Sequence, residues 1–256
     1  MNYKIDNIFN ELKINGYAEI DQFWDESLEL EIEDYYHKKF LILEKNSSVD
    51  KYGNRNFALA DEELINSPFE KIKKSPIFIN LYSKLLELNN INTDLIDIHN
   101  ILSYQKNDYE SNYKMSSKFH FDAFYITIII PVKTPKKKSN DGGATLLLYP
   151  NLRKLASNSI FNYLTKFFIQ NLFLRYLFFN SLTRKYLKPK KIKIDKNKIL
   201  IFYGYRSLHG NTQLKYNNIK VQAIYHIFNP HRDSIIDRYV FSRNNKVRKN
   251  KLNKNK

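Results

Sequence analysis

The chain has 256 residues, of which 43% are hydrophobic, enough apolar material for one large folded domain, so a disordered chain is excluded. It contains no cysteine, which excludes disulfides, thiolate metal sites, iron–sulfur clusters and cysteine nucleophiles. Its 42 Lys and Arg against 26 Asp and Glu give a net charge of +16, which on its own leaves a nucleic-acid-binding protein open.

The first hundred residues are predicted to be mainly helical. Apolar residues recur at helical spacing over residues 4–14, Gly16 is expected to end this helix, and residues 17–20 alternate as in a strand. A charged helix is expected over 25–44, and one or two more over 60–90.

The pattern changes at residue 99. Short apolar runs follow one another with turn residues between them, without the regular intervening helices of βαβ units. This order favours an antiparallel sandwich or barrel, so the expected fold class is α+β and mainly β. The predicted strands lie within residues 99–104, 119–131, 144–148, 199–203 and 221–228.

One segment, between residues 151 and 193, interrupts these strands. Its aromatic and aliphatic residues recur at helical spacing, and it contains ten basic residues and no acidic one. We expect either a helical lid packed on the barrel or, through residues 155–190, a surface that contacts an anionic membrane or holds an anionic, lipid-like substrate. Residues 243–256 carry seven more basic residues and no acid, and are expected to form a disordered tail.

Two of the six histidines begin an H-x-D triplet. In the first, His120 and Asp122 stand at the start of a predicted strand, where alternate side chains leave the same face. With a second histidine, such a pair makes a 2-His-1-carboxylate site, which leaves three coordination positions free and suits non-haem Fe(II). His209, which follows the predicted strand at 199–203, is the natural third ligand. The triplet at 231–233 has no later histidine to complete a site and is the weaker alternative.

Five segments extend this pattern along the chain. They are H-F-D at 120–122, D-G-G-A-T-L-L-L-Y-P at 141–150, I-D-K-N-K-I-L-I-F at 194–202, H-G-N at 209–211 and Lys220. In this order and spacing the chain resembles the phytanoyl-CoA dioxygenase family of Fe(II)/2-oxoglutarate-dependent oxygenases. It departs from that family at Lys220, where arginine is usual, and at residues 149–154, which replace a P-G-S-H turn.

The resemblance implies a double-stranded β-helix core of the jelly-roll or cupin type. It implies that His120, Asp122 and His209 are the catalytic ligands of Fe(II), with 2-oxoglutarate and O2 as cosubstrates. Lys220 would bind the distal carboxylate of 2-oxoglutarate as a point charge, without the fork of an arginine. Asn211 or Thr212 would add a hydrogen bond to this cosubstrate.

Three further residues are weaker candidates. Tyr104 and Tyr125 lie near the site in strand order and are candidate contacts of the cosubstrate. Arg206, three residues before His209, is a candidate contact of an anionic substrate.

The expected organisation is one oxygenase domain over residues 1–242. Its helix-rich part covers 1–98, its β core covers 99–230 with the insertion at 151–193, and the tail at 243–256 follows. The expected reaction is hydroxylation of an unactivated C–H bond in a small-molecule, lipid-like or anionic substrate, with conversion of 2-oxoglutarate to succinate.

Other functions and the location follow from charge and hydropathy. Residues 1–100 carry a net −8 and residues 101–256 a net +24, so a nucleic-acid-binding protein or a metal-free binding module stays as the alternative. The start of the chain is polar, and no run of 18 apolar residues occurs. We therefore expect a cytoplasmic protein that contacts a membrane, if at all, at its surface.

Overall fold

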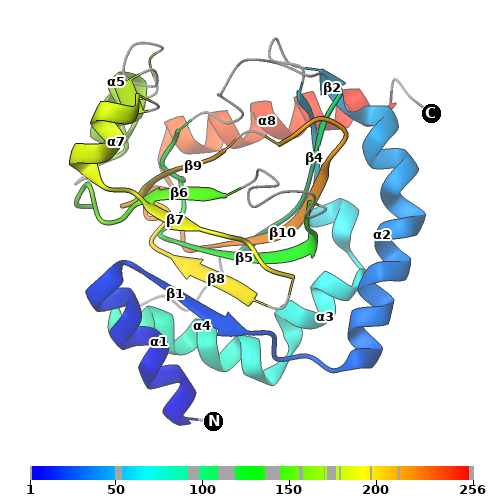
Figure 1. The fold of residues 1–256 in the computed structure, drawn as a ribbon, viewed down its shortest axis with the longest axis horizontal. Helices are drawn as coiled ribbons and strands as arrows, with labels where there is room; N and C mark the ends of the chain where they lie inside the picture. The colour runs from blue at the N-terminus through cyan, green and yellow to red at the C-terminus, as the bar shows by residue number, and fades with distance from the viewer. Residues whose placement is uncertain are drawn as a thin grey trace.

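Two antiparallel sheets of unequal size face each other (Figure 1). The computed structural model describes residues 2–49, 54–91, 98–108, 119–135, 145–155, 158–169, 171, 177–178, 180–196, 198–212 and 214–253. The large sheet has the order β1 (Tyr17–Asp21), β8 (Lys198–Phe202), β5 (Ile126–Lys133), β10 (Ile219–Ile227), β4 (Ile98–Asn107), β3 (Asn54–Ala60) and β2 (Ser48–Val49). The small sheet has the order β7 (Lys190–Ile192), β6 (Leu146–Tyr149) and β9 (Leu208–Asn211).

The large sheet is buried on both faces, and the alternation of side chains along β10 separates the two. Val221, Ala223 and Tyr225 belong to the core between this sheet and the helices. Ile224, with the opposite parity, packs against an apolar cluster between the two sheets. The buried members of that inner cluster are Ile129, Leu146, Leu148, Ile192, Leu200 and Phe202.

Helices from the first third of the chain cover the outer face of the large sheet (Figure 1). They are α1 (Asn2–Asn15), α2 (Glu26–Asn46), the 3-10 turn η1 (Asp61–Leu64), α3 (Pro68–Lys74) and α4 (Pro76–Leu88). The Asp25 side chain caps α2 by accepting from the Leu28 N–H at 2.9 Å, and the Ser75 hydroxyl caps α4. The helices and the strand predicted over residues 4–90 are thereby confirmed.

Gly16 ends α1 for a steric reason as well as a conformational one. Its φ of +76° lies in the left-handed region. A Cβ built there would also meet the Cβ of Pro150 at 2.6 Å. The turn between α1 and β1 therefore packs directly against the end of β6.

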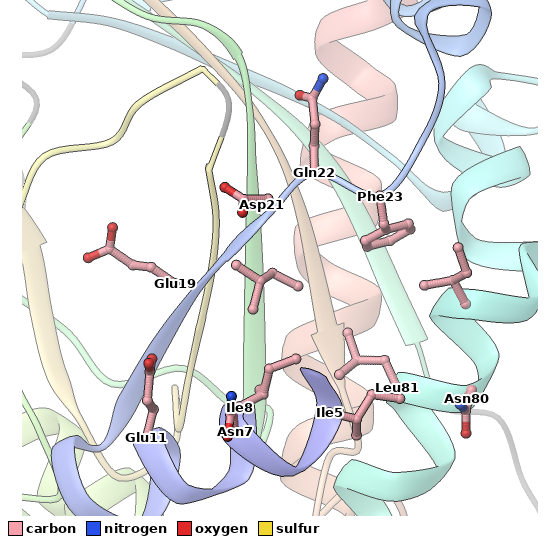
Figure 2. A pocket seen from close by; sticks show the side chains of 12 residues that line it. Ile5, Asn7, Ile8, Glu11, Glu19, Asp21, Gln22, Phe23, Asn80 and Leu81 are labelled. Atoms are coloured by element: carbon pink, nitrogen blue, oxygen red, sulfur yellow. The ribbon is translucent and has the colours of Figure 1, made fainter. Parts of the chain in front are cut away.

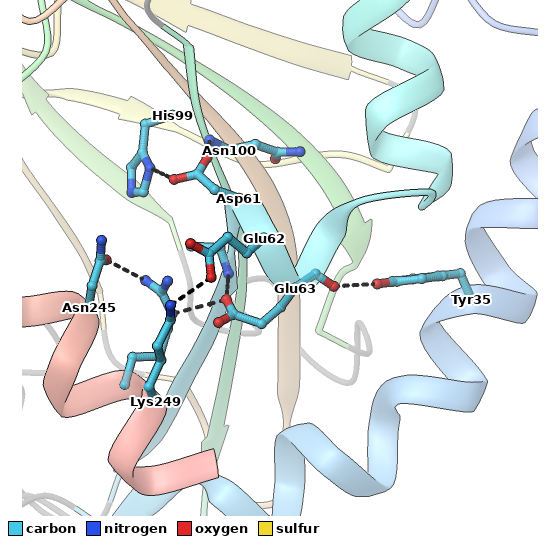
Figure 3. A network of polar contacts seen from close by, with 10 residues as sticks. Tyr35, Asp61, Glu62, Glu63, His99, Asn100, Asn245 and Lys249 are labelled. Carbon is cyan, nitrogen blue, oxygen red and sulfur yellow. Dashed lines mark hydrogen bonds and ion pairs between the residues drawn. The ribbon is translucent and has the colours of Figure 1, made fainter. Parts of the chain in front are cut away.

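The expected disordered tail is wrong for the residues that the structure describes, because α8 (Ile235–Asn253) runs through it. Figure 3 shows how α8 is held against η1: Arg248 Nε lies 3.0 Å from Glu63 Oε2 and Lys249 Nζ 2.7 Å from Glu62 Oε2. Leu252 packs against the apolar core between the large sheet and the helices, called the outer core below. The basic run thus meets acids that lie far away in the sequence.

The segment between β6 and β7 is helical in part, and the predicted insertion bounds of 151–193 are wrong at their end, because residues 190–192 form β7 of the small sheet. It contains α5 (Ser159–Ile169) and α7 (Ser181–Leu187), whereas residues 172–176 lie outside the described part. The glycine-containing turn expected at 141–143 also lies outside it. In the described part of the chain, every helix is too short or too polar to cross a membrane.

Candidate metal centre

Three side chains converge at one end of the space between the sheets. One potential ligand atom from each of His120, Asp122 and His209 lies within 4.8 Å of the others. Asp122 Oδ1 is 3.4 Å from His120 Nε2 and 3.6 Å from His209 Nε2. These are the three residues that the sequence predicted as metal ligands.

The backbone holds the two histidines in register. The N–H of each donates to the carbonyl of the other at 3.0 Å, and together they form an isolated β-bridge. The Asp122 N–H donates to the Gly204 carbonyl, also at 3.0 Å. The prediction that His120 begins the strand is wrong, because β5 starts only at Ile126. The isolated bridge to His209 of β9, and not a continuous strand, positions His120.

His209 is held in one tautomer. Its Nδ1–H donates to the Ser207 carbonyl at 3.0 Å, so the lone pair of Nε2 faces Asp122. Burial lowers the pKa of His209 to about 4, although the Asp122 carboxylate opposes the shift. The imidazole is therefore neutral at pH 7, the form that binds metal ions.

Asp122 is buried, and its second carboxylate oxygen is held by a hydrogen bond. The Thr127 hydroxyl donates to its Oδ2 at 2.5 Å and lies 3.2 Å from Nδ1 of His226, which acts as the donor in that second contact. Burial raises the pKa of Asp122, but the imidazoles of His209 and His226 and the hydrogen bond to His120 outweigh it and hold the pKa well below 3.8. The carboxylate is charged, and its Oδ1 lies between the two imidazoles, where a metal ion would bind all three groups.

Gly204 leaves room for this arrangement. A Cβ at this position would lie 2.2 Å from Thr127 Oγ1 and 2.3 Å from Asp122 Oδ2. No side chain fits there, so glycine is required by the close approach of the carboxylate.

The donor set fits a divalent iron ion. Two imidazole nitrogens and one carboxylate oxygen on one side leave the other coordination positions open, as in non-haem Fe(II) oxygenases. The hydrogen bonds from Thr127 and to Ser207 are the outer contacts that orient metal ligands in proteins.

Lys220 lies on the inner face of β10 and is buried. It has the same parity as Ile224 and His226, and among the described residues it makes no hydrogen bond or ion pair. Burial lowers its pKa to about 7. Two residues along, the buried Gln222 has an amide nitrogen that also lacks an acceptor in the described part of the chain. Two donors on this face are therefore available to an anion.

The other predicted contacts are placed in different ways. Asn211 is two residues from His209 in β9, so both side chains leave the same face. The Thr212 hydroxyl accepts from the Thr145 N–H at 3.0 Å, and Arg206 lies over the Tyr203 ring at 5.4 Å.

The two candidate tyrosines are not brought to the metal ligands. Tyr104 belongs to the outer core and its ring packs against Phe40 of α2, on the face opposite Lys220. Tyr125 packs on the same outer core, with its ring against Tyr203. In the second H-x-D triplet, His231 Nε2 lies 3.1 Å from the Tyr205 hydroxyl and Asp233 is fully exposed. Within the described part of the chain, that triplet belongs to no cluster of three candidate metal ligands.

Sequence reasoning missed the residues behind the ligands. These residues are Thr127, Gln222 and His226. In the sequence they are polar residues within strands and belong to no motif, and only the pairing of β5 with β10 shows that they face inward. Gly204 precedes His209 by five residues, and its spacing carries no motif.

A pocket elsewhere on the molecule is separate from this centre. It has a volume of about 410 Å³ and lies between α1, β1 and α4, with Glu11, Glu19 and Phe23 among its lining residues (Figure 2). None of the three metal-ligand candidates lines it.

Solved structures share the fold of this chain. A prolyl hydroxylase from Trichoplax adhaerens, in complex with a hypoxia inducible factor peptide fragment, is 16% identical over 89% of this chain and 90% of its own, with a TM-score of 0.51. The non-heme alpha ketoglutarate dependent epimerase SnoN from nogalamycin biosynthesis is 10% identical over 89% and 84%, with a TM-score of 0.58. A SnoN complex with Fe3+, alpha ketoglutarate and nogalamycin RO gives 12% identity over 89% and 85%, with a TM-score of 0.53. Neither a family model nor a curated protein matches the sequence. The chain thus has the fold of 2-oxoglutarate–Fe(II) oxygenases.

Thr127 provides a test of the support behind Asp122. Thr127→Val keeps the shape but removes the hydroxyl, so we expect the affinity for Fe(II) or Co(II) to fall about 10- to 100-fold. Thr127→Ser keeps the hydroxyl and is the matched control, with affinity near that of the wild type. Metal titration by calorimetry measures both, and equal affinities in the two variants would contradict this role.

Proposed function

We propose that this protein is an Fe(II)/2-oxoglutarate-dependent oxygenase that hydroxylates an unactivated C–H bond. One observation carries the proposal. A His-Asp-His set lies beside the apolar cluster between the sheets, and the inner face of β10 carries a buried lysine without an anionic partner among the described residues. A metal ion would bind to the His-Asp-His set, and a dicarboxylate cosubstrate bound to that ion would give the lysine an anionic partner.

Each part of the site has a role in this reaction. Bound Fe(II), with 2-oxoglutarate and O2, supplies the oxidising chemistry, and 2-oxoglutarate leaves as succinate and CO2. His120 and His209 contribute neutral nitrogens and Asp122 one negative charge. Lys220 and the amide of Gln222 hold the distal carboxylate, and Asn211 is placed to add a hydrogen bond. The apolar cluster between the sheets keeps water away.

The finer assignment follows from the same residues. We propose a double-stranded β-helix core and membership of the phytanoyl-CoA dioxygenase-like group. The H-x-D triplet, the later H-G and the cation eleven residues beyond it support this assignment. The solved structures named above hold a peptide fragment in one case and nogalamycin RO in another, so the fold accommodates different ligands. For this chain we propose a small-molecule or lipid-like, anionic substrate.

The outer face of α5 supports contact with a membrane surface. Five apolar side chains at helical spacing are between 46% and 74% exposed there, which is unusual for a helix in water. The surrounding insertion carries ten basic residues and no acid. We propose that this face lies on an anionic membrane. The exposed residues are Ile160, Phe161, Leu164, Phe167 and Phe168.

Asp122 tests the proposed reaction. Asp122→Ala removes the only negatively charged ligand of the set, so we expect succinate formation from 2-oxoglutarate to fall at least 100-fold. The visible absorption of the anaerobic Fe(II)–2-oxoglutarate complex should be lost as well. Asp233→Ala, in the exposed second triplet, is the control and should behave as the wild type. Undiminished succinate formation by folded Asp122→Ala would refute the site.

Lys220 tests the mode of cosubstrate binding. Lys220→Met keeps most of the volume and removes the charge, so we expect KM for 2-oxoglutarate to rise about 10- to 100-fold, as for other lost hydrogen bonds to charged groups. Lys220→Arg should retain more affinity than Lys220→Met. Lys198→Met, which removes an exposed lysine of β8, is the control. An unchanged KM in Lys220→Met would show that another group holds the distal carboxylate.

The membrane proposal is tested by flotation with lipid vesicles. The wild type should float with vesicles that contain phosphatidylserine and not with pure phosphatidylcholine. Replacing Phe167 and Phe168 by serine should abolish flotation, because it removes the two most exposed side chains of the face. Leu30→Ser with Leu41→Ser, on exposed positions of α2, is the control. Equal flotation of both double variants contradicts the proposal.

A further inference from the structure

Arg153 lies beside the candidate metal ligands and takes no part in the proposed oxygenase reaction. It follows β6, and its Cζ lies 4.1 Å from the ring centroids of both Phe121 and Tyr205. Phe121 is the residue between two metal ligands. The Arg153 Nε donates to the Tyr205 carbonyl at 2.6 Å, and the two rings fix the plane of the guanidinium.

The two terminal nitrogens of Arg153 are unsatisfied. Nη1 and Nη2 are both buried and have no hydrogen-bond acceptor in the described part of the chain. Buried donors without partners cost about 1–3 kcal/mol each, and more when they are charged. A protein keeps such a group where a ligand supplies the acceptor.

A second cation, Lys166, reaches the same place from α5. It makes no ion pair among the described residues, and it interacts electrostatically with both Arg153 and Asp122. Burial, followed by repulsion from Arg153, lowers its pKa to about 8. It lies on the helix face opposite the exposed apolar side chains, together with the buried Asn162.

The acids near these two cations already have other partners. Asp237 accepts from the Tyr163 hydroxyl at 2.5 Å and from the Ser234 hydroxyl at 3.3 Å. Asp122 accepts from Thr127 and faces the metal position. Neither carboxylate forms an ion pair with Arg153 or Lys166 within the described residues, so the positive charge is left for a ligand.

We infer that Arg153 and Lys166 form a subsite for an oxyanion of the substrate, a carboxylate or a phosphate group, next to the metal centre. The role as a substrate subsite rests on the proposed oxygenase function. A guanidinium with both terminal nitrogens free matches two oxygens of such a group, and the ammonium adds a point charge. The subsite is separate from Lys220, which lies on β10 and not on the insertion side.

The experiment measures binding of two small probes, phenyl phosphate and benzoate, to the full chain by calorimetry. Zn(II) and 2-oxoglutarate are present so that the metal position is filled, and each titration is repeated without them. Arg153→Gln and Lys166→Gln should each weaken the better-binding probe at least tenfold. Lys154→Gln, which removes the exposed neighbouring cation, should bind as the wild type. Benzyl alcohol, a neutral probe, should not distinguish the variants.

The remaining outcomes separate the possible failures. Tighter binding of phenyl phosphate assigns a phosphate group, and tighter binding of benzoate a carboxylate. Equal probe affinity in the wild type, Arg153→Gln and Lys166→Gln overturns the inference, as does a loss of 2-oxoglutarate affinity without a loss of probe affinity. If Arg153→Gln does not fold, Lys166→Gln and Arg153→Lys, which keeps the charge without the fork, decide. If metal does not bind but probe binding depends on both cations, the oxygenase proposal fails and the oxyanion site stands.

Discussion

The site depends on the reciprocal backbone hydrogen bonds between His120 and His209. They connect the segment before β5 to β9, and so they join the large sheet to the small one at the point where the ligands meet. These main-chain hydrogen bonds fix the spacing of the two backbone segments that carry the histidines. Metal sites held by the backbone and by outer hydrogen bonds are more accurately placed than sites on free loops.

The alternation of side chains along β10 places apolar residues on one face of the strand and the polar residues near the site on the other. The outer face of β10 is apolar and packs under the helices, whereas its inner face carries Lys220, Gln222 and His226. The His226 side chain contacts the Thr127 hydroxyl, which donates to Asp122, and Lys220 lies six residues before His226 in the same strand. A single strand thus serves the metal ligand at one end and the expected cosubstrate carboxylate at the other.

Much of this arrangement was predictable because it rests on local patterns. The periodicity of apolar residues predicted the N-terminal helices, and the spacing of His120, Asp122 and His209 predicted the metal centre. Tyr104 lies on the buried outer face of β4, whereas the other face of this strand is half-buried, and the mixed polar and apolar sequence of the strand does not show which parity faces the metal ligands.

Contacts between distant segments were beyond such patterns. The ion pairs near the end of α8 are made with Glu62 and Glu63, which are nearly two hundred residues away. The gap that Asp122 needs at Gly204 and the aromatic stack around Arg153 likewise exist only when the chain is folded. The local sequence around Gly204 and Arg153 does not predict these contacts.

The buried ammonium of Lys220 lowers the conformational stability of the folded protein, and the proposed cosubstrate would offset this effect. Its pKa in the folded chain, about 7, lies below the ordinary 10.5, so the unfolded chain binds this proton more tightly. The resulting destabilisation, on the order of 5 kcal/mol, is fully present below pH 7 and fades as the pH rises toward 10.5. A carboxylate bound beside the ammonium offsets this cost. If the proposed cosubstrate binds at Lys220, the ligand-free protein is the less stable form, and stability is lost at one side chain in exchange for binding.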